Sequence, residues 1–165
     1  MNIRRGLLLA LTVVAVTWLG APAAQAQGFQ RFVPFLIDLS GWTGGKPDGM
    51  SLQMPGNAMD TATRKYQRSG AIVDAQIIVG AAAQAVLAPT QAGIKFESSE
   101  GRLGTSTIDG FVVTQAYTTA SKSGTVIVAL ANNAVFNLAF NGITDDEALA
   151  LAKKFDWKAI QGALK

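Results

Sequence analysis

Few side chains in this sequence are of a type that could do chemistry. Its 165 residues include neither cysteine nor histidine. Disulfides, thiol nucleophiles, imidazole-based acid/base catalysis and zinc sites of the Cys/His type are therefore excluded. The sequence predicts no cofactor, no metal site and no catalytic constellation. Carboxylates, thioethers and a few aromatic and basic side chains remain as candidates for function.

Three carboxylates lie close enough in sequence to converge as the acid pair of a glycoside hydrolase: Glu97, Glu100 and Asp109. Such an enzyme needs two carboxyl groups about 5 to 10 Å apart in one cleft. Solvated strand ends are the simpler interpretation of these residues. A carboxylate-dependent hydrolase that acts on envelope polymers is nevertheless our alternative hypothesis for the function.

The three methionines that follow Met1 lie within ten residues, at Met50, Met54 and Met59. Thioethers are soft ligands for Cu(I), so copper handling is a third hypothesis. Met50 and Met54 share a predicted strand face with Leu52, which is the pattern of core filling. We therefore expect these methionines to pack inside the protein.

A glycine-rich stretch, residues 40–49 (SGWTGGKPDG), is the loosest part of the chain. Its Trp42 either plugs the end of the core or contacts a ligand or partner as an exposed aromatic residue. We assign ligand or partner binding to two residues of this loop and two of the predicted strand 61–68: Trp42, Lys46, Arg64 and Tyr66.

The first 26 residues have the features of a secretory signal peptide. Arg4 and Arg5 precede an apolar run from Gly6 to Gly20, and Ala24-Gln25-Ala26 forms a small-residue cleavage site. The run has 15 residues, against the roughly 20 that span a bilayer. We expect cleavage before Gln27 and a periplasmic or secreted location, with a retained anchor as the competing interpretation. The mature chain, residues 27–165, is predicted to be one domain with no membrane span.

The charge of the mature chain gives little support for binding to nucleic acid. Removing Arg4 and Arg5 from the 14 Lys and Arg leaves 12 basic side chains against 11 acidic ones, so the net charge is about +1. Nucleic acids and anionic membranes select clustered basic residues. The expected partner is an envelope protein or a small ligand, and the oligomeric state is left open.

The spacing of apolar residues predicts an α+β fold. Period-two patterns indicate strands, and apolar residues at spacings of three and four indicate helices. Thr144 with Glu147 forms a capping box, and Asp156 is a second N-cap. The pattern predicts a short helix over 32–39, strands over 50–54, 61–68, 71–79, 94–98, 111–119, 125–131 and 134–141, and helices over 81–88, 145–155 and 157–164.

These elements favour an antiparallel β-sheet with the helices packed on one face, including the C-terminal helix. The opposite face of the sheet is then the wetter one. Residues 99–110 are interpreted as a glycine-containing connection. The three strands after it, separated by short turns, are predicted to form a meander.

Leu39-Ser40-Gly41-Trp42, Pro47 and the strand that contains Ala62, Arg64 and Tyr66 together resemble small exported bacterial proteins of unassigned function. This resemblance implies an envelope location and a compact α+β domain, and it assigns no active site. The order of elements is also similar to that of PsbP/Mog1-type sandwiches, whose members act mostly as accessory or binding proteins. The leading hypothesis is therefore a non-enzymatic binding or accessory domain that uses the polar sheet face or the Trp42 loop.

Overall fold

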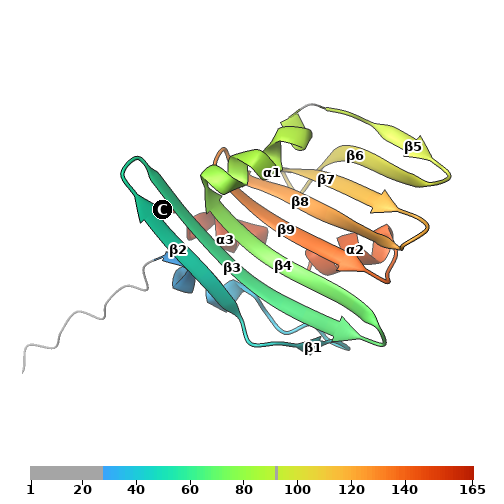
Figure 1. The fold of residues 1–165 in the computed structure, drawn as a ribbon, viewed down its shortest axis with the longest axis horizontal. Helices are drawn as coiled ribbons and strands as arrows, with labels where there is room; N and C mark the ends of the chain where they lie inside the picture. Colours follow the sequence, from blue (N-terminus) through green and yellow to red (C-terminus); the bar gives the residue numbers. More distant parts are fainter. Residues whose placement is uncertain (1–27, 92) are drawn as a thin grey trace, which may run out of the picture.

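The described part of the chain is built on one antiparallel sheet of nine strands. The computed structural model describes residues 28–91 and 93–165, so the predicted signal peptide lies outside the described residues. The strand order is β1-β3-β4-β9-β8-β7-β6-β5. β2 pairs with the same edge of β3 as β1 does, but with an earlier stretch of that strand. The β2–β3 hairpin therefore forms one end of the sheet and the β5–β6 hairpin the other (Figure 1).

Strands and helices follow one another along the chain in nearly the order that the spacing of apolar residues predicts. None of the helices in the two described ranges is long and apolar enough to cross a membrane. The elements are η1 (Gly28–Phe35), β1 (Thr43–Gly44), β2 (Asp48–Met54), β3 (Asn57–Arg68), β4 (Ala71–Gly80), α1 (Ala81–Gln91), β5 (Phe96–Ser98), β6 (Gly101–Ile108), β7 (Phe111–Thr118), β8 (Ser123–Ala131), β9 (Ala134–Asn141), α2 (Asp145–Ala152) and α3 (Trp157–Gly162).

Tight turns set the register of the long hairpins. In the β6–β7 turn Asp109 and Gly110 have φ values of 52° and 87°. Two successive positive φ values define a type I′ turn, whose twist matches that of the flanking strands. Ser69 and Gly70 form the same kind of turn between β3 and β4, with φ values of 47° and 83°. The predicted hairpin and the meander of β7, β8 and β9 are both confirmed.

Strand β6 is the element that the sequence pattern missed. Its sequence, GRLGTSTI, contains two glycines and only two large apolar residues, so it lacks the alternation of a half-buried strand. It pairs with β7 along its whole length, from Gly101 opposite Thr118 to Ile108 opposite Phe111. The β6–β7 turn therefore imposes a strand conformation on a segment with little β-pattern of its own.

One face of the sheet carries the main hydrophobic core. Helices η1, α2 and α3 pack there, behind the sheet in Figure 1. Both predicted N-caps are confirmed: Thr144 Oγ1 accepts from the Glu147 amide at 3.2 Å, and Asp156 Oδ1 accepts from the Ala159 amide at 2.9 Å. The Glu147 carboxylate pairs with Arg68 rather than returning to the Thr144 amide as in a full capping box. The caps begin the two C-terminal helices so that Leu151, Trp157 and Ile160 face the core.

Helix α1 does not share that face, which corrects the prediction that the helices lie on one side. Ala83 and Leu87 of α1 pack with Ile78, Ile127 and Val135 on the opposite face, in front of the sheet in Figure 1. Successive strand residues point to opposite faces, and these three positions alternate with core residues. α1 also runs to Gln91, past the end at Ala88 predicted from Pro89.

Gly80 makes the transition from β4 to α1 possible, and this gives a first prediction. Its φ is +98°, and a Cβ built there would lie 1.9 Å from the Ala58 carbonyl oxygen. We expect Gly80→Ala to lower the free energy of unfolding by about 2 kcal/mol or more, because strain and steric overlap add. Urea unfolding followed by circular dichroism measures this.

The matched control is Gly162→Ala. A Cβ at Gly162 meets nothing within 4 Å, and this residue lies in α3 without a positive φ. Its substitution should change stability by less than about 1 kcal/mol. Equal losses for the two variants would contradict the role assigned to Gly80.

Candidate functional site

Tyr66 and Arg64, two of the predicted binding residues, attach the segment before β1 to β3. Tyr66 is completely buried, and its hydroxyl donates to the Ile37 carbonyl at 2.7 Å. The Arg64 guanidinium donates to the Leu36 carbonyl at 2.7 Å and to the Gly45 carbonyl at 2.8 Å. Both side chains therefore satisfy backbone acceptors next to β1, at Leu36 and Ile37 before it and at Gly45 after it.

Trp42 closes the core beside them. It is only 9% exposed, and the Arg68 guanidinium lies 4.3 Å from its ring centroid in a cation–π contact. Arg68 also pairs with Glu147 of α2. Lys46 is the exposed member of the predicted set. The structure thus brings Trp42, Arg64 and Tyr66 together around the segment before β1, where Trp42 and Tyr66 present almost no surface to a ligand.

Burial raises the pKa of Tyr66 from 10.0 to about 12. Loss of hydration of the phenolate is the main cause, Arg64 opposes it, and the carboxylate of Asp38 adds to it. The hydroxyl therefore stays protonated, as its donated hydrogen bond requires.

The carboxylates of the hydrolase hypothesis are placed at the two ends of β6. Glu97 lies opposite Arg102, whereas Asp109 is in the turn that follows Ile108. Asp109 lies seven residue steps along the chain from Arg102, which is about 23 Å at roughly 3.3 Å per residue. Glu97 and Asp109 therefore do not share a cleft of the size that such a pair needs.

The methionines do not fill the core, which corrects that prediction. Met50, Leu52 and Met54 share a strand face as expected, but they are 54%, 44% and 53% exposed. They lie on the α1 side of the sheet, beyond the end of the helix-covered patch. Copper binding by these thioethers stays a prediction.

Polar side chains on the uncovered part of the α1 face bond to each other. Thr63 donates to Asp74 at 2.7 Å, and Thr125 donates to Asn137 at 2.5 Å. Both pairs join neighbouring strands across the face. These four side chains thus form hydrogen bonds with each other within the sheet.

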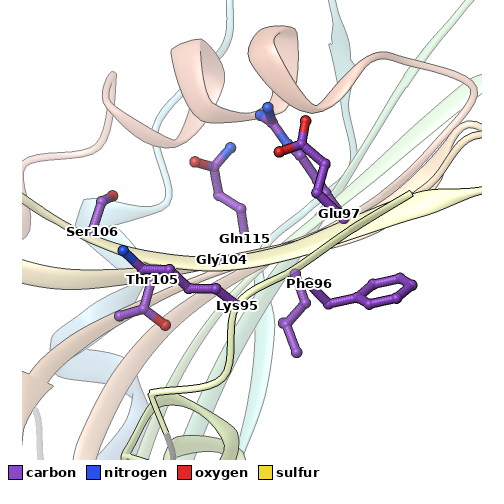
Figure 2. Close-up of a pocket in the computed structure, with 9 residues that line it drawn as sticks. Lys95, Phe96, Glu97, Gly104, Thr105, Ser106 and Gln115 are labelled. Atoms are coloured by element: carbon purple, nitrogen blue, oxygen red, sulfur yellow. The ribbon is translucent and has the colours of Figure 1, made fainter. Parts of the chain in front are cut away.

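A groove of about 400 Å³ lies at the other end of the sheet, beside β6. Strand β5 pairs with β6 only from Gly101 to Leu103, and the chain before Phe96 then leaves the edge. No strand of the described residues pairs with the outer edge of β6 from Gly104 to Ile108. The groove is lined by Lys95, Phe96, Glu97, Arg102, Leu103, Gly104, Thr105, Ser106 and Gln115 (Figure 2).

The turn after β6 determines which backbone groups face this groove. The residues that close a two-residue type I′ turn, here Ile108 and Phe111, bond to each other. Hydrogen-bonded positions alternate along an antiparallel strand, so Ser106 and Gly104 also bond towards β7. Thr105 and Thr107 consequently point their amide and carbonyl groups outward, along the free edge.

The two sides of the groove differ in chemistry. Figure 2 shows Glu97, Ser106 and Gln115 on the side of the C-terminal helices, and Lys95, Phe96 and Thr105 on the other. On the helix side Arg102 pairs with Asp145 and Asp146 of α2.

Glu97 lies opposite Arg102 in the strand pairing, so three carboxylates and one guanidinium lie on the helix side at this end of the sheet, which is therefore acidic. The Nε2 atom of Gln115 on this side is buried and has no hydrogen-bond partner. On the other side Phe96, which is 58% exposed, lies next to Leu103, and Lys95 and Thr105 flank this apolar pair.

Comparisons with family models, with curated proteins and with solved structures found no match to this chain. Apart from Glu97, the groove residues were missed at the sequence level because β6 was interpreted as a connection. The available signal was the Asp109-Gly110 pair, which favours a tight hairpin turn and so predicts a strand on each side.

Tyr66 gives a second prediction, which concerns stability at alkaline pH. A pKa that is higher in the folded than in the unfolded protein contributes stability below pH 10, and this contribution is lost as the pH rises towards 12. Tyr66→Phe should lower the unfolding free energy by about 1 to 2 kcal/mol at pH 7, because the Ile37 carbonyl loses its donor.

The difference between wild type and Tyr66→Phe should then shrink from pH 10 to pH 12. Urea unfolding across this range measures the difference, and phenolate absorbance of the two proteins isolates the titration of Tyr66. A difference that stays constant with pH, or phenolate formation by Tyr66 near pH 10, would contradict the assignment.

Proposed function

We propose that the protein is a non-enzymatic, exported binding domain that receives an extended segment of an envelope protein as an added strand at β6. The observation that carries this proposal is the outer edge of β6, which lies in a groove and has no strand partner among the residues that the structure describes. An extended peptide that pairs with such an edge gains main-chain hydrogen bonds and places alternate side chains on the two sides of the sheet.

Thr105 and Thr107 supply the main-chain contacts. Each offers one outward N–H and one outward C=O, and Gly104 keeps the approach to the edge free of a side chain. An unpaired strand edge is a template for pairing unless it is blocked by charge, proline or short length. The segment Gly104–Ile108 contains neither a charged residue nor a proline.

The two sides of the groove predict the sequence pattern of the partner segment. The acidic helix side, formed by Glu97 and the pair of aspartates around Arg102, favours basic side chains. The Gln115 amide on that side is available to an acceptor on the same segment. On the other side Phe96 and Leu103 favour apolar side chains, which gives an alternating apolar and basic pattern.

This site differs from the surfaces favoured by the sequence alone. Trp42 and Tyr66 are used in packing, and the polar sheet face forms cross-strand bonds. An envelope protein, rather than a small ligand, fits an open groove whose main feature is a strand edge. The signal-like pattern of residues 1–26 supports placing this encounter outside the cytoplasm.

The export step is a third prediction. Expression of the full 165-residue chain in a Gram-negative host should yield a protein that begins at Gln27 and is found in the periplasmic fraction or the medium. Intact-mass spectrometry of the fractionated protein measures this. A chain that keeps residues 1–26 and stays with the membranes would show that the segment is an anchor instead.

Peptide binding is the fourth prediction. The probe is a seven-residue fluorescent peptide in which valine and lysine alternate, and its matched control alternates valine and glutamate. Fluorescence anisotropy should show binding of the lysine peptide in the micromolar range and at least about tenfold weaker binding of the glutamate peptide, because only the former complements the acidic side.

Thr105→Pro tests the edge itself. Proline removes an outward amide that the β6–β7 ladder does not use, so the fold should persist. Thr105→Ala keeps the amide and, like the proline variant, removes the 3.0 Å hydroxyl contact with Thr114. Binding should weaken about tenfold or more in Thr105→Pro and by less than about threefold in Thr105→Ala. Equal binding by the two variants, or amide NMR shifts confined to other strands, would overturn the proposal.

A further inference from the structure

The opposite edge of the sheet carries a second interaction surface, strand β2. This strand has seven residues, Asp48–Met54, all paired with β3 on one side. Among the described residues no strand pairs with its other side. The Pro55-Gly56 turn makes Met54 and Asn57 the closing bonded pair. Gly49, Ser51 and Gln53 therefore point their amide and carbonyl groups outward.

β2 lacks the features that protect the other edge strands. β1 has two residues and is followed by Lys46 and Pro47, and β5 has three residues with Glu97 at its centre. Short length, charge and proline prevent edge strands from pairing with other chains. The only charged residue of β2 is Asp48, at its first position. β2 is therefore a long edge strand that carries no charge after its first residue.

Its side chains form an apolar row on the α1 side. Met50, Leu52 and Met54 are 54%, 44% and 53% exposed, and they are separated by Ser51 and Gln53, which point to the other side. Exposed apolar side chains at every second position of an unpaired edge favour the addition of another strand with the same alternation.

We infer that β2 pairs with β2 of a second copy of this chain, antiparallel about a twofold axis at Leu52. In this register Leu52 lies opposite the partner's Leu52, and Met50 lies opposite the partner's Met54. Ser51 and the partner's Gln53 exchange main-chain hydrogen bonds, and symmetry repeats the exchange. The axis is perpendicular to the sheet, so all six apolar side chains lie on one face.

The second copy fits because the strand is complementary to itself. Asp48 falls beyond the paired stretch, opposite the turn at the partner's Gly56, so no like charges meet. Ser51 and Gln53 of each strand face donors and acceptors of the other, whereas Gly49 lies opposite the partner's Pro55, which has no N–H to donate. The interface is small, which predicts a weak dimer of the micromolar class. In the strand order, the two β6 grooves remain at the far ends of the combined sheet.

Sedimentation velocity over a range of protein concentrations tests the dimer and is the fifth prediction. The purified protein should shift from monomer to dimer in the micromolar range. Leu52→Lys should raise the dimer dissociation constant at least tenfold, because it places two ammonium groups face to face at the axis. Ile72→Lys is the matched control: Ile72 is 42% exposed on the same face, but it lies in β4, inside the sheet. It should leave the constant within about threefold.

Two single-cysteine variants test the register, because a covalent link accumulates even from a weak dimer. The chain has no cysteine, so each variant carries a single thiol. Opposite residues at a non-hydrogen-bonded antiparallel pair have Cα atoms about 4.5 Å apart, which a disulfide spans. Leu52→Cys should form a disulfide-linked dimer under mild oxidation, whereas the exposed control Lys65→Cys on β3 should not.

Three results would overturn the inference. They are a wild-type protein that stays monomeric up to about millimolar concentration, equal effects of lysine at positions 52 and 72, and disulfide formation by the Lys65→Cys variant that is as fast as that by Leu52→Cys. Circular dichroism and the thermal midpoint establish that each variant is folded, so loss of dimer cannot be mistaken for unfolding. If the wild-type chain stays monomeric and a different protein binds β2, the inference is overturned as well.

Discussion

Burial of an aromatic cluster on one face of the sheet is the constraint on which the rest of the structure depends. Phe136 and Phe155 lie with ring centroids 4.8 Å apart, and Tyr66 packs edge-on against Phe155 at 6.4 Å. These rings come from β3, β9 and the chain after α2, so one cluster joins both halves of the sequence. Because side chains alternate along a strand, fixing these rings on one face also fixes which residues point to the other.

The same alternation decides what the edges of the sheet can do. Each turn pins a bonded pair of residues, and every second residue from that pair then turns its amide away from the neighbouring strand. On β6 this leaves Thr105 and Thr107 facing outward, and on β2 it leaves Ser51 and Gln53. A residue's role at an edge thus follows from its distance to the nearest turn rather than from its side chain.

Local chemistry made part of this fold predictable. The meander and its turns follow from strong alternation next to serine, glycine and asparagine, and the Thr144 and Asp156 caps follow from side chains that bond within three residues. Each of these signals is contained in a few neighbouring residues, so tertiary context has little scope to override it.

The predictions that were wrong concern features that depend on contacts with distant parts of the chain, which one segment of sequence does not specify. The face taken by α1 depends on Ile127 and Val135, which are distant in sequence from Ala83 and Leu87. The exposure of Met50 and Met54 depends on β2 being an edge strand with no helix above it, although their spacing is that of a core strand. β6 was missed because its strand character comes from β7 and the turn. In the binding set, an arginine that bonds a ligand cannot be distinguished by sequence from one that bonds a carbonyl, as Arg64 does.

The two edges are too far apart to influence each other through charge. Six strand spacings separate β2 from β6, and at about 4.8 Å each this is roughly 29 Å. The screening length at physiological salt is about 8 Å, so occupation of one edge does not change the potential at the other. A dimer formed through β2 would instead couple the grooves through valency, because one rigid sheet would then carry two grooves that hold two segments of the same partner. Linked sites of this kind increase apparent affinity through effective concentration without any new contact, provided that the partner spans the distance between the grooves.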